Sequence, residues 1–472
     1  MHTTVQVDFT KKTGKQIMPL HGFNSGPMTK VFTYDARPYF VEGGFPYVRL
    51  HDVEYPYGSG EFVDIPCIFK DFDADENDPA SYNFKLTDEY IHQSLLVGSR
   101  IIYRLGVSIE HAPAKRYIDP PKDYGKWARI CEHIIRHYNE GWADGFRWNI
   151  EYWEIWNEPD LHDDKPHEKR TTWGGDLDEF VELYAVTARH LKSLFPHLKI
   201  GGCGFAHAER EFITEFYRKI AKLSPRVPVD FHSWHEYTAK PLSFVSGASK
   251  VRAMLCEFGY GDAESILDEW NLMYRWGPRV NQSPAYPAMK DERGAAFYAG
   301  TLAALQEKTD VALATCFEAD VVKEFCGIFD VDGMCIGGLT KSVEDEYFAT
   351  VKPTKGFYAF KAFNSLYRLG SQAVLSSDSD EILATAAVGD AGVGLIAANN
   401  SDDEKTLSLK LTGVPDEIIV RQTDKDRTND AVLTLSAGEA VNLTLSLPAH
   451  AFVYVGTDLP DPVPTYHPAT HL

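Results

Sequence analysis

Short apolar segments alternate with amphipathic segments over most of the chain. The apolar segments predict buried strands at residues 17–23, 47–51, 100–107, 152–156, 200–205, 229–234, 265–269 and 311–317. Between and after them, apolar residues at helical spacing predict helices over 124–138, 177–194, 249–258, 293–308 and 355–369. Strands that alternate with helices favour a parallel sheet, so eight of them predict an α/β fold, a (β/α)8 TIM barrel over residues 14–369.

The pattern changes after Gly370. Short β-rich segments separated by turn residues follow, which predicts an all-β sandwich over residues 370–458. At the N-terminus, Val5, Val7 and Phe9 alternate with polar residues, as in a half-buried strand. We expect this strand to pair into the sandwich, so that residues 1–13 belong to it. Residues 459–472 contain four prolines and are expected to form an extended C-terminal tail.

Composition and charge narrow the classes of partner. Of 472 residues 44% are hydrophobic, which suits a globular protein, and the net charge of −21 argues against nucleic acid or an anionic membrane as a partner. The N-terminal residues lack the basic and apolar sections of a signal peptide, so we expect a cytoplasmic protein. The seven cysteines are scattered without a CxxC pair, which favours free thiols. A homo-oligomer stays open, because no exposed stripe is specific enough to decide.

Two carboxylates are placed where strands of the predicted barrel end. Residues 156–159 read Trp-Asn-Glu-Pro, which puts Glu158 just after a strand, and Glu269 closes a strand three βα units downstream. The carboxyl ends of all barrel strands open at the same mouth. Two carboxylates there suit hydrolysis of a glycosidic bond, in which one is protonated and the other ionised. A carboxyl separation of ~5 to 5.5 Å would retain the anomeric configuration and ~6.5 to 9.5 Å would invert it, and the sequence leaves this open.

Other acidic residues have simpler interpretations. Glu257 lies off the apolar face of its predicted helix and is expected to be solvated. The acidic segment 71–78 lacks the glycine and the twelfth-position glutamate of a calcium loop, and residues 330–333 are typical of a turn. We therefore expect no metal site. A metal-dependent barrel hydrolase that uses these acidic loops stays an alternative.

The two glutamate motifs resemble those of retaining glycoside hydrolases of clan A, and specifically family 39, which contains β-xylosidases and α-L-iduronidases. The resemblance rests on Trp-Asn-Glu-Pro at 156–159 and Glu-Trp-Asn at 269–271, and further segments match at 47–51, 235–237, 251–271, 316–324 and 447–451. It covers nearly the whole chain. The resemblance implies a retaining glycosidase that needs no cofactor and takes an oligosaccharide or glycoside as its substrate.

Carried over position by position, the resemblance makes Glu158 the general acid/base and Glu269 the nucleophile. Asn157 would hydrogen-bond the sugar hydroxyl beside the anomeric carbon. The subsite for the cleaved sugar would be lined by His51, His235 and Tyr237, with Tyr237 or His235 orienting Glu269, while Asp320 and Glu324 are weaker candidates for sugar contacts.

The chain departs from the family pattern where the sugar would lie. Cys316 or Phe317 stands where members of the family commonly have Trp, which implies an altered floor of the sugar site. Trp173 and Trp276 could stack on sugars or only pack. We expect an exo-acting enzyme that removes terminal xylose- or arabinose-type residues from plant-derived oligosaccharides. The alternatives are a catalytically silent carbohydrate-binding barrel and a glycosidase of the same family acting on a uronic acid, galactose or glucose.

Overall fold

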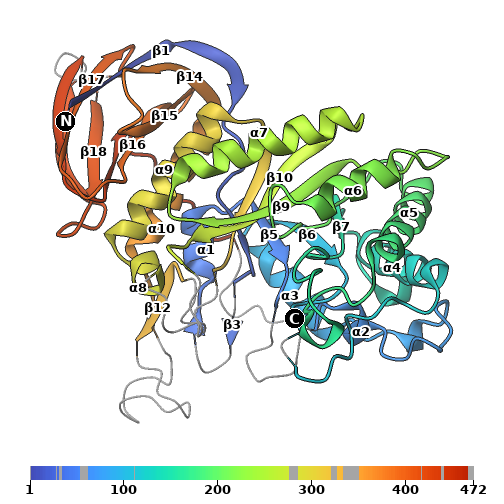
Figure 1. Ribbon diagram of the computed structural model, residues 1–472. Helices are drawn as coiled ribbons and strands as arrows, with labels where there is room; N and C mark the ends of the chain where they lie inside the picture. Colours follow the sequence, from blue (N-terminus) through green and yellow to red (C-terminus); the bar gives the residue numbers. More distant parts are fainter. Residues whose placement is uncertain are drawn as a thin grey trace.

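A ring of eight parallel strands forms the centre of the protein. The computed structural model describes residues 2–27, 29–30, 34–53, 62–110, 112–275, 285–319, 327–332, 350–415, 417–436 and 441–465. The strand order is β8-β7-β6-β5-β2-β11-β10-β9. After β8, the backbone amide of His235 donates to the carbonyl of Phe205 at 2.8 Å, which links the two ends of the sheet. The predicted TIM barrel is confirmed (Figure 1), with strands β2 (Gly22–Asn24), β5 (Tyr47–Leu50), β6 (Arg100–Leu105), β7 (Tyr152–Ile155), β8 (Lys199–Gly201), β9 (Phe231–Thr238), β10 (Glu264–Leu272) and β11 (Val311–Cys316).

Helices cover the outside of this ring. All five predicted helices are present, and the structure adds further ones that the periodicity did not reveal. The α-helices are α1 (Arg37–Gly43), α2 (Ile65–Ile68), α3 (Lys85–Leu96), α4 (Tyr124–Asn139), α5 (Leu177–Leu194), α6 (Glu211–Ile220), α7 (Pro241–Glu257), α8 (Ala285–Lys290), α9 (Glu292–Lys308) and α10 (Lys355–Leu369). Short 3-10 helices span η1 (Pro79–Ser81), η2 (Trp142–Asp144) and η3 (His167–Lys169).

The predicted start of α7 was wrong by eight residues. The helix begins at Pro241, whose fixed φ suits the first helical position. The helix continues through Gly247. An added Cβ at this position would come within 2.9 Å of the Trp234 ring, so the glycine allows the helix to pack closely on β9. Glu257 is exposed at the end of the helix, as expected.

The start of α5 illustrates how local sequence sets an element that supports the barrel. Asp176 accepts a hydrogen bond from the amide of Glu179 at 2.9 Å, and the Glu179 carboxylate accepts one from the amide of Asp176 at 2.8 Å. This capping box satisfies two amides that the first turn leaves unpaired. The helix then buries Phe180, Leu183 and Tyr184.

The interior of the barrel changes from apolar to charged along its axis. Its lower layer is a cluster of buried apolar residues, Tyr47, Ile102, Tyr152, Phe231, Ile266 and Leu313. Two residues further along their strands lie Arg49, Glu154 and Asp268, all fully buried. Because side chains alternate along a strand, these charged groups also face inward. The charged layer therefore lies directly beneath the mouth of the barrel.

A second domain is built from one nine-stranded mixed sheet. Its order is β19-β18-β21-β16-β15-β14-β1-β17-β20. The first strand, β1 (His2–Gln16), pairs antiparallel with β14 and parallel with β17. Val5, Val7 and Phe9 are buried in a core with residues of the other strands. The remaining strands are β14 (Ser371–Ser377), β15 (Leu383–Gly389), β16 (Gly392–Asn399), β17 (Lys405–Thr412), β18 (Glu417–Thr423), β19 (Asp430–Ser436), β20 (Asn442–Leu447) and β21 (Ala451–Gly456).

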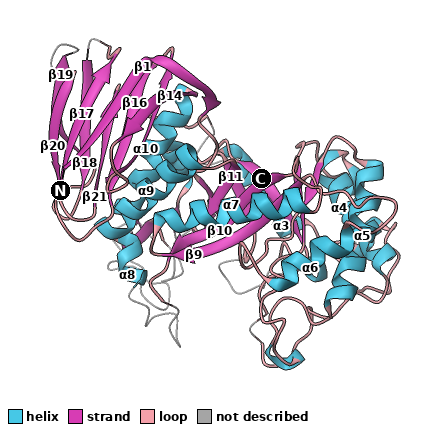
Figure 2. Ribbon diagram, turned by 45° about the horizontal axis from the view of Figure 1, so that its top comes forward, coloured by secondary structure: helices cyan, strands magenta, loops and turns pink. Residues whose placement is uncertain are grey.

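Helices α9 and α10 lie between the two domains (Figure 2). Ile396 and Phe452 from the sheet belong to the same buried cluster as the barrel helices, so one apolar core crosses the boundary. The C-terminal segment, described as far as residue 465, has no regular structure from residue 457 onward. It is tied to α10, where Arg368 donates to the carbonyl of Pro460 at 2.9 Å and Lys361 lies 2.9 Å from the carboxylate of Asp461.

Two short hairpins and an acidic loop segment lie outside the barrel strands. Residues 330–332 do not form a turn but belong to strand β12 (Phe329–Asp332), which pairs with β13 (Thr350–Pro353). A second short hairpin joins β3 (Thr29–Lys30) to β4 (Tyr34–Asp35). In the acidic segment 71–78, Asp71, Asp75 and Asp78 accept hydrogen bonds from nearby backbone amides, as turn residues do.

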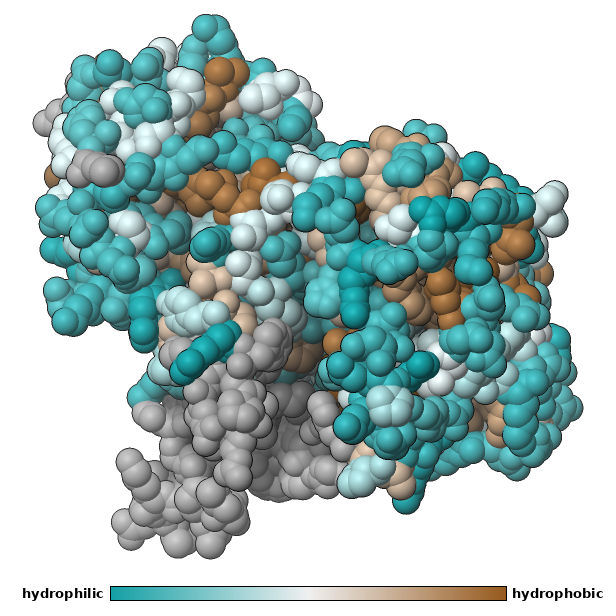
Figure 3. Space-filling view, in the orientation of Figure 1, coloured by the Kyte–Doolittle hydropathy of each residue, from teal (hydrophilic) through white to brown (hydrophobic). Residues whose placement is uncertain are grey.

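On the face drawn in Figure 3, hydrophilic residues cover most of the described surface, and apolar residues form small separate patches. The described cysteines are all free thiols. Among the described helices, none is both long and apolar enough to cross a membrane.

Candidate active site

The loop that follows β7 brings Glu158 into the mouth of the barrel through an unusual backbone. Trp156 and Glu158 have φ values of 74° and 47°, in the left-handed region that residues with a Cβ rarely adopt. Gly106 makes room for this turn, because an added Cβ there would lie 3.1 Å from Cα of Trp156. The amide of Glu158 donates to the carbonyl of Gly204 at 2.8 Å, which ties the loop to the segment after β8. Backbone strain held in this way is common where a side chain must be aimed.

Glu158 and Glu269 face each other across the mouth. Their exposed fractions are 6% and 4%. One oxygen of each carboxyl group and a ring nitrogen of His235 all lie within 4.8 Å of one another. The structure therefore brings the two predicted carboxylates together, with an imidazole beside both.

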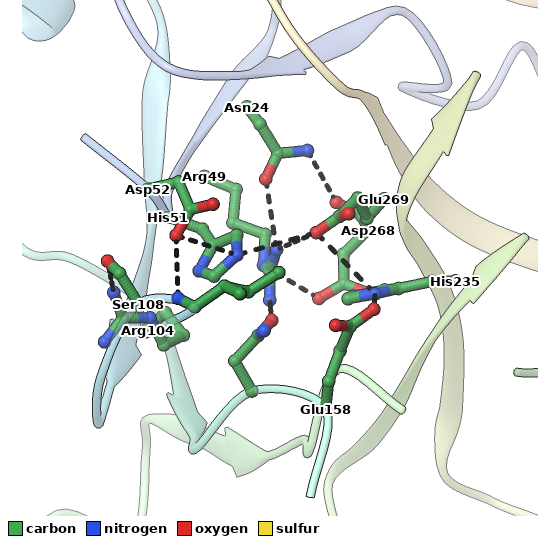
Figure 4. Close-up of polar contacts among 12 residues, drawn as sticks. Asn24, Arg49, His51, Asp52, Arg104, Ser108, Glu158, His235, Asp268 and Glu269 are labelled. Carbon is green, nitrogen blue, oxygen red and sulfur yellow. Dashed lines mark hydrogen bonds and ion pairs between the residues drawn. The ribbon is translucent and has the colours of Figure 1, made fainter. Parts of the chain in front are cut away.

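Arg49 is the centre of the buried network beneath these carboxylates (Figure 4). Its Nη1 donates to Glu269 Oε2 at 3.3 Å, its Nε to Glu154 Oε2 at 2.8 Å, and its Nη2 to Asn157 Oδ1 at 2.7 Å. Nη1 also donates to Asn24 Oδ1 at 3.1 Å. One guanidinium thus fixes four groups from β2, β10 and the β7 strand with its following loop, for which a planar fork of donors is well suited.

His235 and Tyr237 engage different carboxylates. The Tyr237 hydroxyl donates to Glu269 Oε1 at 2.7 Å, whereas Nδ1 of His235 lies 2.8 Å from Glu158 Oε1. The same nitrogen is 3.6 Å from Glu269 Oε2. Of the two residues expected to orient Glu269, Tyr237 makes the hydrogen bond and His235 makes its own with Glu158.

His51 and Asn157 complete the rim of the space between the carboxylates. Nε2 of His51 lies 3.8 Å from Glu269 Oε2 and 3.4 Å from Asp52 Oδ1. Its ring centroid is 6.3 Å from that of Phe317, so the residue that follows β11 lies beside it. Asn157 uses its carbonyl oxygen on Arg49, and its buried Nδ2 has no hydrogen-bond partner among the described residues. This amide is a donor ready for a ligand.

The environment shifts the acidity of both carboxyl groups. Burial raises the pKa of Glu158 to about 8, with Arg49 opposing the rise and Asp52 adding to it. Burial also raises the pKa of Glu269, and Glu158 adds to the rise, while His235, Arg49 and the Tyr237 hydroxyl oppose it. Burial lowers the pKa of His235 to about 4, so its imidazole is neutral near pH 7. The donors that contact Glu269 favour its charged form, and Glu158 is the group that holds a proton at neutral pH.

Some predicted residues are not part of this arrangement. Trp173 is buried, and its ring lies 5.2 Å from that of Trp156, so it packs behind the Glu158 loop and does not line the mouth. Asp320, Glu324 and Trp276 lie outside the described residues.

Three residues of the charged layer were missed by the sequence reasoning. Arg49, Glu154 and Asp268 lie inside segments that were predicted only as strands. A charged residue at an inward position of a buried strand is costly unless it is paired. Such residues in three strands of one barrel were the signal that could have found this layer.

One group of described residues could hold a metal ion, and it is the site itself: Glu158, His235 and Glu269. Two carboxylates and a neutral imidazole are acceptable ligands for several divalent metals. However, both oxygens of Glu269 already accept hydrogen bonds, from Tyr237 and from the Arg49 guanidinium. A cation bound there would lie next to that guanidinium, so these residues fit a pair of acid–base groups better than a metal centre.

Comparisons with known proteins identify the family. The model of glycosyl hydrolases family 39 matches residues 36–314, which is more than half of the chain. A beta-xylosidase of Geobacillus stearothermophilus is 28% identical over 378 residues, which cover 72% of this chain and 67% of that protein. A beta-xylosidase of Caldicellulosiruptor saccharolyticus is also 28% identical, over 45% of this chain and 40% of its own length.

Solved structures agree on the architecture. A glucosidase from Croceicoccus marinus superposes with a TM-score of 0.74 at 22% identity, and the match covers 98% of this chain and 100% of that one. A family 39 beta-xylosidase from Caulobacter crescentus gives 0.64 at 17% identity, over 97% and 100% of the two chains. At these identities the likeness is one of fold. The family match over residues 36–314 shows that this chain, a glycosidase, belongs to glycosyl hydrolases family 39.

Proposed function

We propose that the protein is a retaining, exo-acting glycosidase that removes terminal xylose- or arabinose-type residues from plant-derived oligosaccharides by double displacement. The observation that carries this proposal is the approach of the two carboxyl groups, with one oxygen of each within 4.8 Å of the other. Retaining enzymes keep these groups ~5 to 5.5 Å apart, whereas inverting enzymes need ~6.5 to 9.5 Å for a water molecule. An oxygen–oxygen approach of this size is compatible with the shorter separation and with direct attack on the sugar.

In this mechanism Glu269 attacks the anomeric carbon. Its oxygens receive hydrogen bonds from the Tyr237 hydroxyl and the Arg49 guanidinium, which stabilise the ionised form and hold the carboxylate in one orientation. The bond between the anomeric carbon and the leaving oxygen breaks as the bond to Glu269 forms. A covalent glycosyl-enzyme results.

Glu158 supplies the proton for the leaving oxygen in the first step and removes one from water in the second. Burial raises its pKa to about 8, so the free enzyme carries this proton at neutral pH. The neutral His235 at 2.8 Å can hydrogen-bond either form of the carboxyl group. Glu158 can therefore act as an acid in the first step and as a base in the second step of one turnover.

Asn157 and His51 would contact the sugar held between the two carboxyl groups. Because Arg49 holds the amide oxygen of Asn157, its free Nδ2 can donate to the hydroxyl next to the anomeric carbon. His51 lies on the Glu269 side of the same space. Asp320 and Glu324 stay candidates for further sugar contacts.

The choice of a pentose rests on the curated relatives, two of which are named beta-xylosidases. Phe317, just after β11, lies beside His51 and would form part of the floor of the sugar site. Because the family commonly has a Trp here, the smaller ring keeps arabinose-type sugars as candidates beside xylose.

The test is a panel of aryl glycosides: β-xyloside, α-L-arabinofuranoside, α-L-arabinopyranoside, β-galactoside and β-glucoside. Proton NMR of the first product formed from the best substrate reports its anomer. We expect fastest turnover on a pentoside and retention of configuration. Inversion would contradict double displacement. Fastest turnover on a hexoside would contradict the proposed pentoside substrate. Oligosaccharides of graded length then test exo action, which predicts single sugars at the earliest time points.

A further inference from the structure

Three buried carboxyl groups surround the single guanidinium of Arg49. Glu154 Oε2 is 2.8 Å from its Nη2, Asp268 Oδ2 is 3.0 Å from its Nε, and Glu269 Oε2 is 3.3 Å from its Nη1. All four side chains are essentially without solvent contact. If all three carboxyl groups were ionised, one positive charge would face three negative ones in a medium that stabilises isolated charge poorly. The charge balance therefore favours a proton on at least one of the three.

The hydrogen bonds indicate which group that is. Glu154 accepts from Arg49 and from the Ser233 hydroxyl, and Glu269 accepts from Arg49 and Tyr237. Neither oxygen of Asp268 accepts a hydrogen bond from any described residue. A buried carboxylate that has only the ion pair with Arg49 and accepts no hydrogen bond is the costliest of the three to keep ionised. Asp268 is therefore the neutral member, and a proton on it gives it a donor for Glu154.

We propose that Asp268 and Glu154 share one proton and one negative charge, and that this pair is a positioning element that sets the protonation of Glu158 and Glu269 above it. This deepens the proposed function, since it rests on the roles given to those two residues. The single negative charge shared by Asp268 and Glu154 then balances the positive charge of Arg49. The site above then carries a single negative charge, on Glu269.

The acidity of the two groups supports this division. Burial raises the pKa of Asp268 well above its usual range against the opposing effect of Arg49, and Glu154 adds to the rise. Burial opposes ionisation of Glu154 too, but Arg49, a hydrogen bond from Asp268 and the Ser233 hydroxyl together lower its pKa.

Three further titratable groups lie near the pair, and none of them adds an unbalanced charge. His235 presents Nε2 at 3.5 Å from Asp268 Oδ1 and is neutral, because burial lowers its pKa. Cys203 stays a thiol, because burial raises its pKa. Arg104, the neighbour of Glu154 on β6, has its charge balanced by Asp64. The titratable and charged groups that face the pair from the surrounding strands are therefore Arg49, Cys203, His235 and Glu269.

The pair connects to the reaction through Arg49 and His235. Arg49 touches Glu269 directly, and His235 touches Glu158 at 2.8 Å while its other nitrogen faces Asp268. A second negative charge beneath them would disfavour ionisation of both glutamates. Loss of the last negative charge would favour it, because the guanidinium would then act on Glu269 almost uncompensated.

The experiment compares Asp268→Asn, Glu154→Gln and the double variant by the pH dependence of kcat/KM. Each single variant leaves one carboxyl group to carry the one charge, so we expect both limbs of the profile to stay at their wild-type positions, whatever happens to kcat. The double variant removes that charge, and both limbs should move to lower pH by about 1 unit or more. A shift of that size in Asp268→Asn alone would overturn the proposal, because it would mean that Asp268 is ionised in the native enzyme.

Infrared difference spectroscopy gives a readout that does not depend on activity. Wild type minus Asp268→Asn at pH 7 should show the carbonyl stretch of a protonated carboxylic acid, and its absence would overturn the proposal. The control Asp310→Asn removes an exposed carboxylate just before β11, which forms an ion pair with Arg252, and should give no such band. If Glu158→Gln left the alkaline limb in place, the proposed function would fail, while the infrared band would still decide the protonation of Asp268.

Discussion

His235 and Tyr237, two residues apart on β9, each hold one of the two facing carboxyl groups. Nδ1 of His235 lies 2.8 Å from Glu158 Oε1, and the Tyr237 hydroxyl lies 2.7 Å from Glu269 Oε1. Alternate residues of a strand point to the same face, so one strand serves both sides of the site. A neutral imidazole can donate or accept, whereas Tyr237 donates to a carboxylate that must stay ionised. The two side chains match the different duties proposed for Glu158 and Glu269.

Replacement of the proposed nucleophile should abolish turnover. Glu269→Ala is expected to lower kcat by at least about 10⁴-fold, because it removes the group proposed to attack the anomeric carbon. Steady-state kinetics on the best aryl glycoside measure this loss. Added azide should restore turnover and give a glycosyl azide of inverted configuration, since it would attack from the vacated side. A variant that keeps more than a tenth of the activity would rule out this role.

Replacement of the proposed acid/base should depend on the leaving group. Glu158→Ala should lose about 10² to 10⁴-fold on glycosides with poor leaving groups. It should keep the first step nearly intact on dinitrophenyl glycosides, whose departure needs no proton. Pre-steady-state bursts with a series of aryl glycosides separate the two cases. Equal losses across the series would count against the assignment.

The pH dependence of activity follows from the acidity of Glu158. Burial raises its pKa to about 8, and the group must be protonated to act, so kcat/KM should fall above about pH 8. Glu158→Gln, assayed on a dinitrophenyl glycoside, should lack this alkaline limb. The same limb in the variant would assign it to another group and would contradict the role of Glu158 as the acid in the proposed function.

The raised pKa of Glu158 should also make the folding stability of the protein depend on pH. The folded pKa of Glu158 is raised above the unfolded value, so the folded state binds the proton more tightly. Its contribution to stability is complete below about pH 4.5 and is lost as the pH rises through about 8. Urea unfolding of wild type and Glu158→Gln between these values should show a steeper decline for the wild type. Parallel curves would contradict a raised pKa.

Loss of the Tyr237 hydroxyl should weaken the nucleophile. A hydrogen bond to a charged group contributes about 1.5 to 3 kcal/mol, so Tyr237→Phe should lower kcat/KM by roughly 10- to 150-fold. The acid limb should move to higher pH, because this hydroxyl lowers the pKa of Glu269. As a control, Tyr260→Phe removes a buried hydroxyl bonded to the carbonyl of Val227, away from the mouth. It should change neither quantity, and similar effects in both variants would indicate only a loss of packing.

The alternation of apolar segments was enough to predict eight strands, because burial on both faces makes each parallel strand a continuous apolar run. It missed α1, α3 and α6, and it began α7 at 249 when the helix begins at Pro241. Gly247 obscured that start, because its reason for being small lies in contact with Trp234, which the local pattern does not contain.

The sequence by itself determined that Glu158 follows a strand and that Glu269 lies toward the carboxyl end of another; in a parallel barrel both ends open at the same mouth. Strand β10 continues to Leu272, three residues beyond its predicted end at Glu269. Only the tertiary structure decided which group each carboxylate contacts. Arg49 on β5, His235 on β9 and Asp268 on β10 come together through the closure of the ring. Their distances decide which carboxyl groups are charged, because buried charges respond to neighbours a few ångströms away, whatever their separation along the chain.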